Sequence, residues 1–329
     1  MVSEMSKKYD IICIGAALVD MVAQVERHPL EDDEVFVSEL NILSGGAAAN
    51  TSVTCSKLGL NTAFIGKLGL DDEFGAKIIK DFEEDSVSIE YIKYSKAYKT
   101  GSAYVALNPA GDRRIYAHSG AANYLSASDI KENEISNANI LYLSSLKNIE
   151  PFIKASTIAK ASRIPIILNP GMLIIEQGFE LIKSLLQKID ILILSENEFR
   201  SLLAINREIG FQKDYYETSC EILKELGIKI IIITLGKRGA LLISHKDSQI
   251  INPIENINIV DTTGAGDAFS AGFIYKFHKK KRLQFGELIK CVEIGNFVAG
   301  KCIEQLGARY GIPSLKEVKQ FGNSINNKI

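Results

Sequence analysis

Short, unbroken apolar runs recur along the chain, and segments with helical spacing separate them. A strand that is buried on both faces needs apolar side chains at every position, so these runs predict buried strands of a parallel sheet. Between them, residues 179–186, 199–203 and 220–226 repeat apolar positions at helical spacing. The alternation predicts an α/β fold, with helices on both faces of a mainly parallel sheet. The runs are residues 11–14, 164–168, 191–194 and 228–233.

Two segments, at about residues 18–43 and 100–118, interrupt this order. In them apolar and polar residues alternate, which predicts antiparallel strands of a small sheet outside the main one. Met21, Val37 and Tyr104 would share an apolar face of that sheet. Because an exposed apolar sheet is prone to association, we expect this face to be buried in a homodimer.

A third pattern marks a candidate site for chemistry. Residues 257–260 are mostly β-branched and predict the end of a strand, while residues 268–277 have helical spacing. Gly264 and Gly266 therefore open a helix, whose first N–H groups can bind a phosphate or a developing negative charge. Asp267 lies in the first turn, where the helix dipole favours its ionised form. The structural alternative is a tight turn in which Asp267 merely caps the helix.

Composition excludes several classes of function. With 329 residues and a net charge of −2, the chain lacks the strong positive charge that would attract a nucleic acid. The one basic cluster, residues 276–282, ends a predicted helix, where cations offset the dipole and face water. We find no apolar run of membrane-spanning length and no signal core, and we expect a cytoplasmic protein. The five scattered cysteines are typical of reduced core thiols, and the four histidines are too dispersed for a zinc site.

Two distant segments together resemble the signatures of the ribokinase (PfkB) family of carbohydrate and nucleoside kinases. The first is Gly-Gly-Ala-Ala-Ala-Asn at residues 45–50, and the second is Asp-Thr-Thr-Gly-Ala-Gly-Asp at residues 261–267. The similarity covers about residues 9–320. It implies a ribokinase-like three-layer fold, with one kinase domain over residues 1–329 and a discontinuous β-lid from the two segments above. Further matching strings are Ile14-Gly15 with Asp20, residues 111–123, 168–170, 234–239, and Gly307-Ala308-Arg309.

The resemblance implies an ATP-dependent sugar kinase that phosphorylates a hydroxymethyl oxygen. Asp267 would be the general base, and Gly264, Ala265 and Gly266 would present backbone N–H groups to the transferred phosphoryl as an anion hole. Four residues match the family's acceptor-binding positions, where a carboxylate and an amide can hold a diol. They are Asp20, Gly45, Gly46 and Asn50. Without the signature, Asp20 could equally be a turn residue.

Nucleotide binding must come from residues outside the familiar loops, since the chain has neither a P-loop nor a dinucleotide fingerprint. Glu198 would order magnesium waters by resemblance, although it could instead only cap its helix. The family has an asparagine three residues before this glutamate, whereas here Ser195 or Asn197 must substitute. The nucleotide candidates are Ser195, Glu198, Thr234, Gly236 and Gly239, and Asp261 with Thr263 matches a potassium loop of many relatives.

The acceptor stays open at this stage. Ala47 replaces a lysine of ribokinases, and Ser144 or Ser145 stands where they have a glutamate, so the pocket is roomier and less charged. A sugar leads, with a nucleoside as the alternative that fills the extra volume. Arg113 and Arg114 would meet an acidic or phosphorylated sugar, or are solvated hairpin charges. Two further alternatives are ADP as the donor and a catalytically inactive binding regulator.

Overall fold

The computed structural model describes residues 7–110, 112–205, 211–280 and 284–326. Its largest element is an eight-stranded sheet in the order β14-β13-β12-β11-β10-β9-β1-β4. All pairs from β12 to β4 are parallel, and only β13 and β14 at one edge are antiparallel. The strands are β1 (Tyr9–Gly15), β4 (Thr62–Ile65), β9 (Ala138–Ser144), β10 (Ile166–Asn169), β11 (Ile191–Ser195), β12 (Ile230–Thr234), β13 (Ala240–Ile243) and β14 (Ser248–Ile251).

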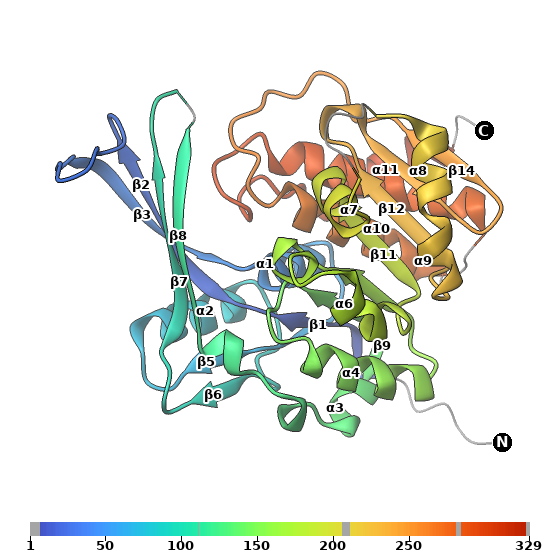
Figure 1. The fold of residues 1–329 in the computed structure, drawn as a ribbon, viewed down its shortest axis with the longest axis horizontal. Helices are drawn as coiled ribbons and strands as arrows, with labels where there is room; N and C mark the ends of the chain where they lie inside the picture. The colour runs from blue at the N-terminus through green and yellow to red at the C-terminus, as the bar shows by residue number, and fades with distance from the viewer. Residues whose placement is uncertain (1–6, 111, 206–210, 281–283, 327–329) are drawn as a thin grey trace.

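Helices cover both faces of this sheet (Figure 1). One face packs against α1 (Ala47–Lys57), α2 (Glu73–Glu84), α10 (Ala265–Lys280), α11 (Phe285–Cys302) and α12 (Leu315–Asn326). The other packs against α3 (Glu132–Ser136), α4 (Glu150–Ala161), α5 (Met172–Ile175), α6 (Phe179–Leu186), α7 (Glu196–Leu202), α8 (Lys213–Ser219) and α9 (Glu221–Glu225). The predicted three-layer α/β fold is therefore confirmed.

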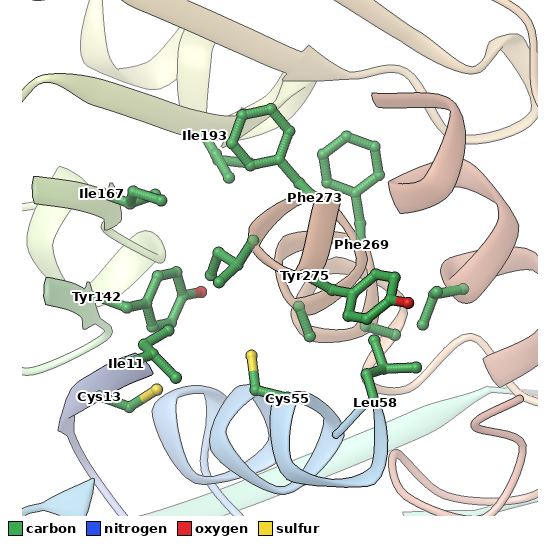
Figure 2. Close-up of a cluster of buried hydrophobic side chains, with 14 of the residues drawn as sticks. Ile11, Cys13, Cys55, Leu58, Tyr142, Ile167, Ile193, Phe269, Phe273 and Tyr275 are labelled. Carbon is green, nitrogen blue, oxygen red and sulfur yellow. The ribbon is translucent and has the colours of Figure 1, made fainter. Parts of the chain in front are cut away.

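Each central strand contributes alternate side chains to two separate cores. Ile11 and Cys13 of β1 face α1 and α10, while Ile12 and Ile14 face the opposite layer, and all are fully buried. A strand in this position has no solvent face, which explains the unbroken apolar runs. Figure 2 shows the first core, where Phe273 of α10 packs over the sheet.

A second, four-stranded sheet has the order β3-β2-β7-β8 and projects from the body of the molecule (Figure 1). Its outer pairs are antiparallel, as expected, but the central β2–β7 pair is parallel. Alternation of apolar and polar residues shows which face of a strand is buried, but it does not show whether the neighbouring strand runs parallel or antiparallel. The sequence therefore could not reveal this pairing. The strands are β2 (Leu18–Val25), β3 (Val37–Gly45), β7 (Thr100–Leu107) and β8 (Arg113–Gly120), and a small separate sheet pairs β5 (Lys67–Gly69) with β6 (Lys93–Ser95).

The strand predicted at residues 257–260 is absent from the structure. This described segment is irregular, and Ile259 and Val260 are 61% and 55% exposed. The Val260 backbone N–H donates to the Ile303 carbonyl at 2.9 Å, outside any ladder. The side chains of Ile259 and Val260 line a cleft, so these β-branched residues form part of a surface and not of a strand.

Smaller expectations have mixed outcomes. All five cysteines are buried free thiols, as predicted. His278 does not face water, since its Nε2 lies 2.9 Å from the Asp10 carboxylate at the start of β1. Residues 281–282 of the basic cluster fall outside the described residues. Within the described ranges, we find no helix with both the length and the apolar character needed to cross a membrane.

Candidate active site

Several parallel strands end at one edge of the main sheet. Gly15, Ser144 and Asn169 are register partners at the ends of β1, β9 and β10, and Ser195 pairs with Thr234 at the ends of β11 and β12. Ligands in open α/β sheets bind outside these carboxyl ends. Helices α1 and α10 contact each other through their first turns near this edge, since Asn50 and Thr51 bond to Asp267.

Asp267 occupies the first turn of α10 and is held from α1. The Asn50 Nδ2 donates to Asp267 Oδ2 at 2.9 Å, and the Thr51 hydroxyl donates to the Asp267 carbonyl at 3.4 Å. Loss of solvation raises the pKa of Asp267 to about 7, against the opposing effects of the Asn50 hydrogen bond and the Arg309 charge. A carboxyl with this pKa can accept a proton near neutral pH.

The glycine turn before Asp267 is tightly packed on one side and open on the other. Gly264 has φ +77°, and a Cβ there would meet the Ala308 Cβ at 2.3 Å. Beyond the neighbouring backbone of its own helix, a Cβ on Gly266 would meet no heavy atom of the described residues within 4 Å. The Ala265 N–H donates to the Thr262 carbonyl at 3.3 Å. Gly264 is therefore required by the fold, whereas Gly266 leaves space that a ligand can enter.

Asp20 lies in the middle of β2, so the reading of it as a turn residue is wrong. Its carboxylate fits beside Gly45, where a Cβ would come within 2.1 Å of Asp20 Oδ2. Gly46 has φ +99° and precedes α1, and a Cβ there would meet the Ala16 carbonyl at 2.4 Å. Both glycines thus make room for backbone and carboxylate. Desolvation raises the pKa of Asp20 to about 6, and the Arg309 charge opposes this shift.

A cleft of about 520 Å³ lies between the small sheet and the loop before α10. It brings Asp20 together with Asp261 and Thr263, three residues that the sequence singled out. Apolar side chains form much of its wall, and sequence analysis had not placed them at the site, although the alternation along β2 could have shown that Val22 shares a face with Asp20. These apolar residues are Val22, Leu43, Val105, Leu107, Ile115, Ile259, Val260 and Leu306.

Asp261 ties two loops together. Its Oδ1 accepts hydrogen bonds from the backbone N–H and the hydroxyl of Thr263, at 2.9 and 2.7 Å. Its Oδ2 accepts from the Gly307 N–H at 2.8 Å. The carboxylate therefore fixes the position of the glycine turn relative to the loop between α11 and α12.

The nucleotide candidates lie around the ends of β11 and β12. Ser195 and Glu198 form a capping box at the start of α7, in which Ser195 N–H donates to Glu198 Oε2 at 2.7 Å and Glu198 N–H donates to Ser195 Oγ at 3.3 Å. Thr234 ends β12 beside Ser195. Gly236 begins the 3₁₀ helix η3 (Gly236–Arg238), and Gly239 has φ +84°, where a Cβ would meet the Ile251 carbonyl at 2.0 Å. The Glu198 charge acts on Asp267, which places this group within electrostatic reach of the candidate base.

Three residues around Asp267 and Asn50 had no role assigned from the sequence: Thr51, Tyr142 and Arg309. The Arg309 Nε donates to Asn50 Oδ1 at 2.9 Å. The Thr51 hydroxyl lies 3.4 Å from the Asp267 carbonyl and 3.3 Å from the buried Tyr142 hydroxyl, and its single proton is donated to one of the two at a time. Arg309 had a signal, because it ends the Gly307-Ala308-Arg309 string, whereas Tyr142 lies in an apolar strand that gives no hint of chemistry.

Comparison with known proteins gives consistent results. The model of the pfkB family carbohydrate kinases matches residues 8–315. Over 313 residues the chain is 29% identical to a ribokinase of Staphylococcus aureus, covering 94% of this chain and 98% of that protein. It is 31% identical to an uncharacterized sugar kinase of Archaeoglobus fulgidus, over 78% and 97% of the two chains. The structure of Arabidopsis thaliana ribokinase complexed with ribose and ATP superimposes with a TM-score of 0.84 at 26% identity, covering 97% and 99%.

Proposed function

We propose, from the premise that this chain belongs to the pfkB family of carbohydrate kinases, that it transfers the γ-phosphoryl group of ATP to a hydroxymethyl oxygen of a sugar. As a member of that family it is a phosphotransferase with an alcohol group as acceptor. The observation that carries the finer proposal is the placement of Asp267. Its carboxylate lies in the first turn of a helix and accepts a hydrogen bond from Asn50. The glycine turn beside it has space for a ligand at Gly266.

In the proposed reaction Asp267 accepts the proton of the acceptor hydroxyl as that oxygen bonds to the γ-phosphorus. The bond from phosphorus to the bridging oxygen breaks, and ADP leaves with its electron pair. The N–H groups of Gly264 and Gly266 stabilise charge on the transferred phosphoryl, and the Ala265 N–H joins them by giving up its long, 3.3 Å bond to the Thr262 carbonyl. Retention of this base beside the glycine turn argues against an inactive binding regulator.

The acceptor would be held by Asp20 and Asn50, with Gly45 and Gly46 making the room that these contacts need. The donor would lie along the ends of β11 and β12, against Ser195, Thr234, Gly236 and Gly239. Magnesium would supply positive charge between the phosphates. Glu198 fits a water-mediated role in part, because its Oε2 already accepts from Ser195, which leaves Oε1 for a magnesium water. Asp261 and Thr263 would order a potassium site next to the anion hole.

A nucleoside is the second candidate acceptor, with its 5′-hydroxyl in place of the sugar's hydroxymethyl group. The apolar wall of the cleft favours it, because a planar base can pack on side chains such as Val22, Val105 and Ile259. A free sugar leads because curated relatives across nearly the whole chain are named ribokinase and deoxyribokinase.

We further propose that residues 1–329 act as one kinase domain, with the sheet from residues 18–43 and 100–118 as its lid. Register places Met21, Ile42 and Tyr104 on one face of that sheet, and Asp20 and Val22 on the other. The face with Met21 has the exposed apolar residues that a homodimer would bury: Val37, Leu40, Ile42 and Tyr116. The opposite face covers the acceptor.

A panel assay tests the proposal. The protein is incubated with magnesium-ATP, or magnesium-ADP, and one acceptor at a time from a set of pentoses, hexoses, sugar phosphates and nucleosides. Acceptor-dependent release of ADP or AMP is then followed. A sugar that gives the highest kcat/KM supports the proposal, and a nucleoside in that place supports the second candidate. Tight binding of a sugar without turnover would leave the regulator as the better account.

A further inference from the structure

Arg309 is a buried cation that is connected to the candidate base through one side chain. It lies in the loop between α11 and α12, is 8% exposed, and donates from Nε to Asn50 Oδ1 at 2.9 Å. Asn50 is 6% exposed and connects Arg309 to Asp267, because its Nδ2 donates to Asp267 Oδ2 at 2.9 Å. The chain Arg309–Asn50–Asp267 joins three segments that are far apart in the sequence.

The chemistry of the three groups determines which way the Asn50 amide points. A guanidinium can only donate hydrogen bonds, so the amide oxygen must face Arg309. The amide nitrogen then faces Asp267 Oδ2, and an N–H donor at that oxygen stabilises the ionised carboxylate more than the protonated carboxyl. If the amide were flipped, its oxygen would face Asp267 and would favour the protonated carboxyl as donor. A protonated Asp267 cannot act as a base.

Arg309 contacts Asp267 through Asn50, and it does not line the cleft in which the acceptor would bind. The 520 Å³ cleft and a cavity of about 200 Å³ share Leu43, Ser44 and Ala308 in their walls, and of these two Arg309 lines only the smaller. The backbone of Arg309 is fixed, because Lys57 Nζ donates to its carbonyl at 3.0 Å. Its neighbour Gly307 bonds to Asp261, so one short loop contacts both the proposed base and the proposed cation loop.

Burial of this guanidinium is costly, which argues that its charge matters. Its Nη1 and Nη2 are buried and have no hydrogen-bond partner among the described residues. Desolvation lowers the pKa of Arg309, and nearby carboxylates oppose that shift. The charged groups that act on Arg309 are Asp20, Asp81, Asp85 and Asp267, and those that act on Asp267 are Asp20, Glu198 and Arg309. Tyr142 and Cys302 also face Asp267, and burial keeps both neutral by raising their pKa values.

We infer that Arg309 is a positioning residue for phosphoryl transfer: it holds the Asn50 amide in the orientation that favours the ionised form of Asp267 and keeps that carboxylate aimed at the acceptor. The inference rests on the proposed role of Asp267 as the base. It assigns to the Gly307-Ala308-Arg309 string a function at the reacting centre, across the interface between the loop and α1.

Three substitutions separate orientation from charge. Arg309→Met removes both the donor and the charge, Arg309→Gln keeps an N–H donor for Asn50 without the charge, and Arg309→Lys keeps the charge. We expect Met to lower kcat by about tenfold or more, with the KM for ATP changed less than about twofold. When kcat is compared at a pH above the acid limb of every variant, Gln should recover most of that loss. Lys77→Met is the matched control, because Lys77 lines the same cavity but bonds to Asp81 and not to Asn50.

The second readout is the titration of Asp267, followed by carbon NMR of labelled aspartate in the folded protein. Loss of a nearby positive charge raises a carboxyl pKa, so in Arg309→Met and Arg309→Gln the titration should move up by roughly one unit, and the acid limb of kcat should follow. Arg309→Lys should keep the titration near that of the wild type. Thermal melting confirms that each variant is folded, and the Gln and Lys variants decide the question if Met does not fold.

The outcomes distinguish this inference from the proposed function. An unchanged Asp267 titration and an unchanged kcat in Arg309→Met would overturn the inference, as would Gln performing no better than Met. A shifted titration with unchanged kcat would also overturn the positioning role. If the wild type transfers no phosphoryl group to any acceptor, the proposed function fails, while the titration still decides whether Arg309 controls the state of Asp267.

Discussion

At the scale of single residues, two opposing effects determine the pKa of the candidate base, Asp267. Desolvation disfavours the charged form of Asp267, while the hydrogen bond from Asn50 and the charge of Arg309 favour it. The balance leaves its pKa at about 7. A general base works best with a pKa near the working pH, because it is then both ionised and basic enough to accept a proton.

We predict that Asp267→Asn lowers kcat by roughly a hundredfold or more, the scale of a lost general base, with a much smaller effect on substrate affinity. In the wild type, kcat should rise with an acid limb near pH 7. Steady-state kinetics from pH 5.5 to 9 check both points. An unchanged kcat would remove Asp267 from the mechanism.

The same variant also has a predicted stability profile. The folded-state pKa of Asp267 lies above the ordinary value of 3.8, so the folded protein binds more protons than the unfolded chain between about pH 4 and 7. The wild type therefore loses stability from this group as pH rises through that window. Asp267→Asn should match it near pH 4 and melt about 2 °C or more higher at pH 8. A lower melting temperature at pH 8 would show that Asp267 is a stabilising cap.

The two glycines of the turn form a matched pair. Gly264→Ala places a Cβ at a positive φ and against Ala308, and should cost about 1–3 kcal/mol of folding stability along with activity. Gly266→Ala meets no heavy atom of the described residues beyond the neighbouring backbone of its own helix, so it should melt close to the wild type yet lose at least about tenfold in kcat, because the methyl enters the proposed anion hole. Thermal melting and kcat separate the two, and full activity of Gly266→Ala would place the phosphoryl elsewhere.

At the scale of elements, the start of α7 has two candidate roles. The Ser195–Glu198 capping box satisfies helix N–H groups, and the same glutamate is the candidate for ordering magnesium waters. The structure supports the cap directly. Because a cap needs only an acceptor whereas a magnesium site benefits from a negative charge, an amide can tell the two roles apart.

We predict that Glu198→Gln keeps the melting temperature within about 1 °C of the wild type, since a glutamine completes a capping box. It should raise the magnesium concentration for half-maximal rate by about fivefold or more, on loss of the charge. Glu198→Ala should lose both the cap and the magnesium affinity, and loss of the cap should cost about 1 kcal/mol of folding stability. A wild-type magnesium dependence in Glu198→Gln would leave Glu198 as a cap alone.

The loop of Asp261 and Thr263 gives a prediction about salts. Potassium should stimulate the reaction, because a cation there would hold the glycine turn and the loop at Gly307 in place. Rates are compared in potassium and in a bulky organic cation at one ionic strength. Equal rates would count against the site.

At the scale of the whole molecule, the small sheet has two unlike faces. One lines the cleft with Asp20 and Val22, and the other exposes apolar residues such as Leu40 and Ile42, which are 52% and 46% exposed. A projecting sheet with such a face is a candidate association surface. Acceptor binding and dimerisation would thus share one sheet. A substitution on the dimer face should therefore change the KM for the acceptor, and one on the cleft face should change dimerisation.

We predict that Val37→Asp dissociates the proposed dimer, because a buried unpaired charge costs several kcal/mol on each subunit. The looser lid should raise the KM for the acceptor and increase ATP hydrolysis without transfer, while the KM for ATP stays nearly constant. Solution mass and both KM values are measured. Leu181→Asp is the control, since Leu181 is 67% exposed on α6, away from the lid. A dimeric Val37→Asp with wild-type kinetics would show that this face is not the interface.

The amino-acid sequence by itself determined the α/β class, most buried strands and the helix that begins at the glycine turn. Burial leaves a local record: residues 11–14 and 230–233 are apolar throughout because both of their faces are covered. The signature strings likewise placed Asp267 and Asn50 at a site, and the structure joins them by a hydrogen bond across 217 positions.

Only the tertiary structure decided what depends on partners that are distant in sequence. The parallel β2–β7 pairing, the irregular path of residues 257–260 and the contact of Arg309 with Asn50 leave no local periodicity. A β-branched segment or a lone arginine has the same pattern whether it joins a ladder, lines a cleft or supports a base. The choice is made by packing between segments that lie far apart in the sequence, and spacing along the chain does not record it.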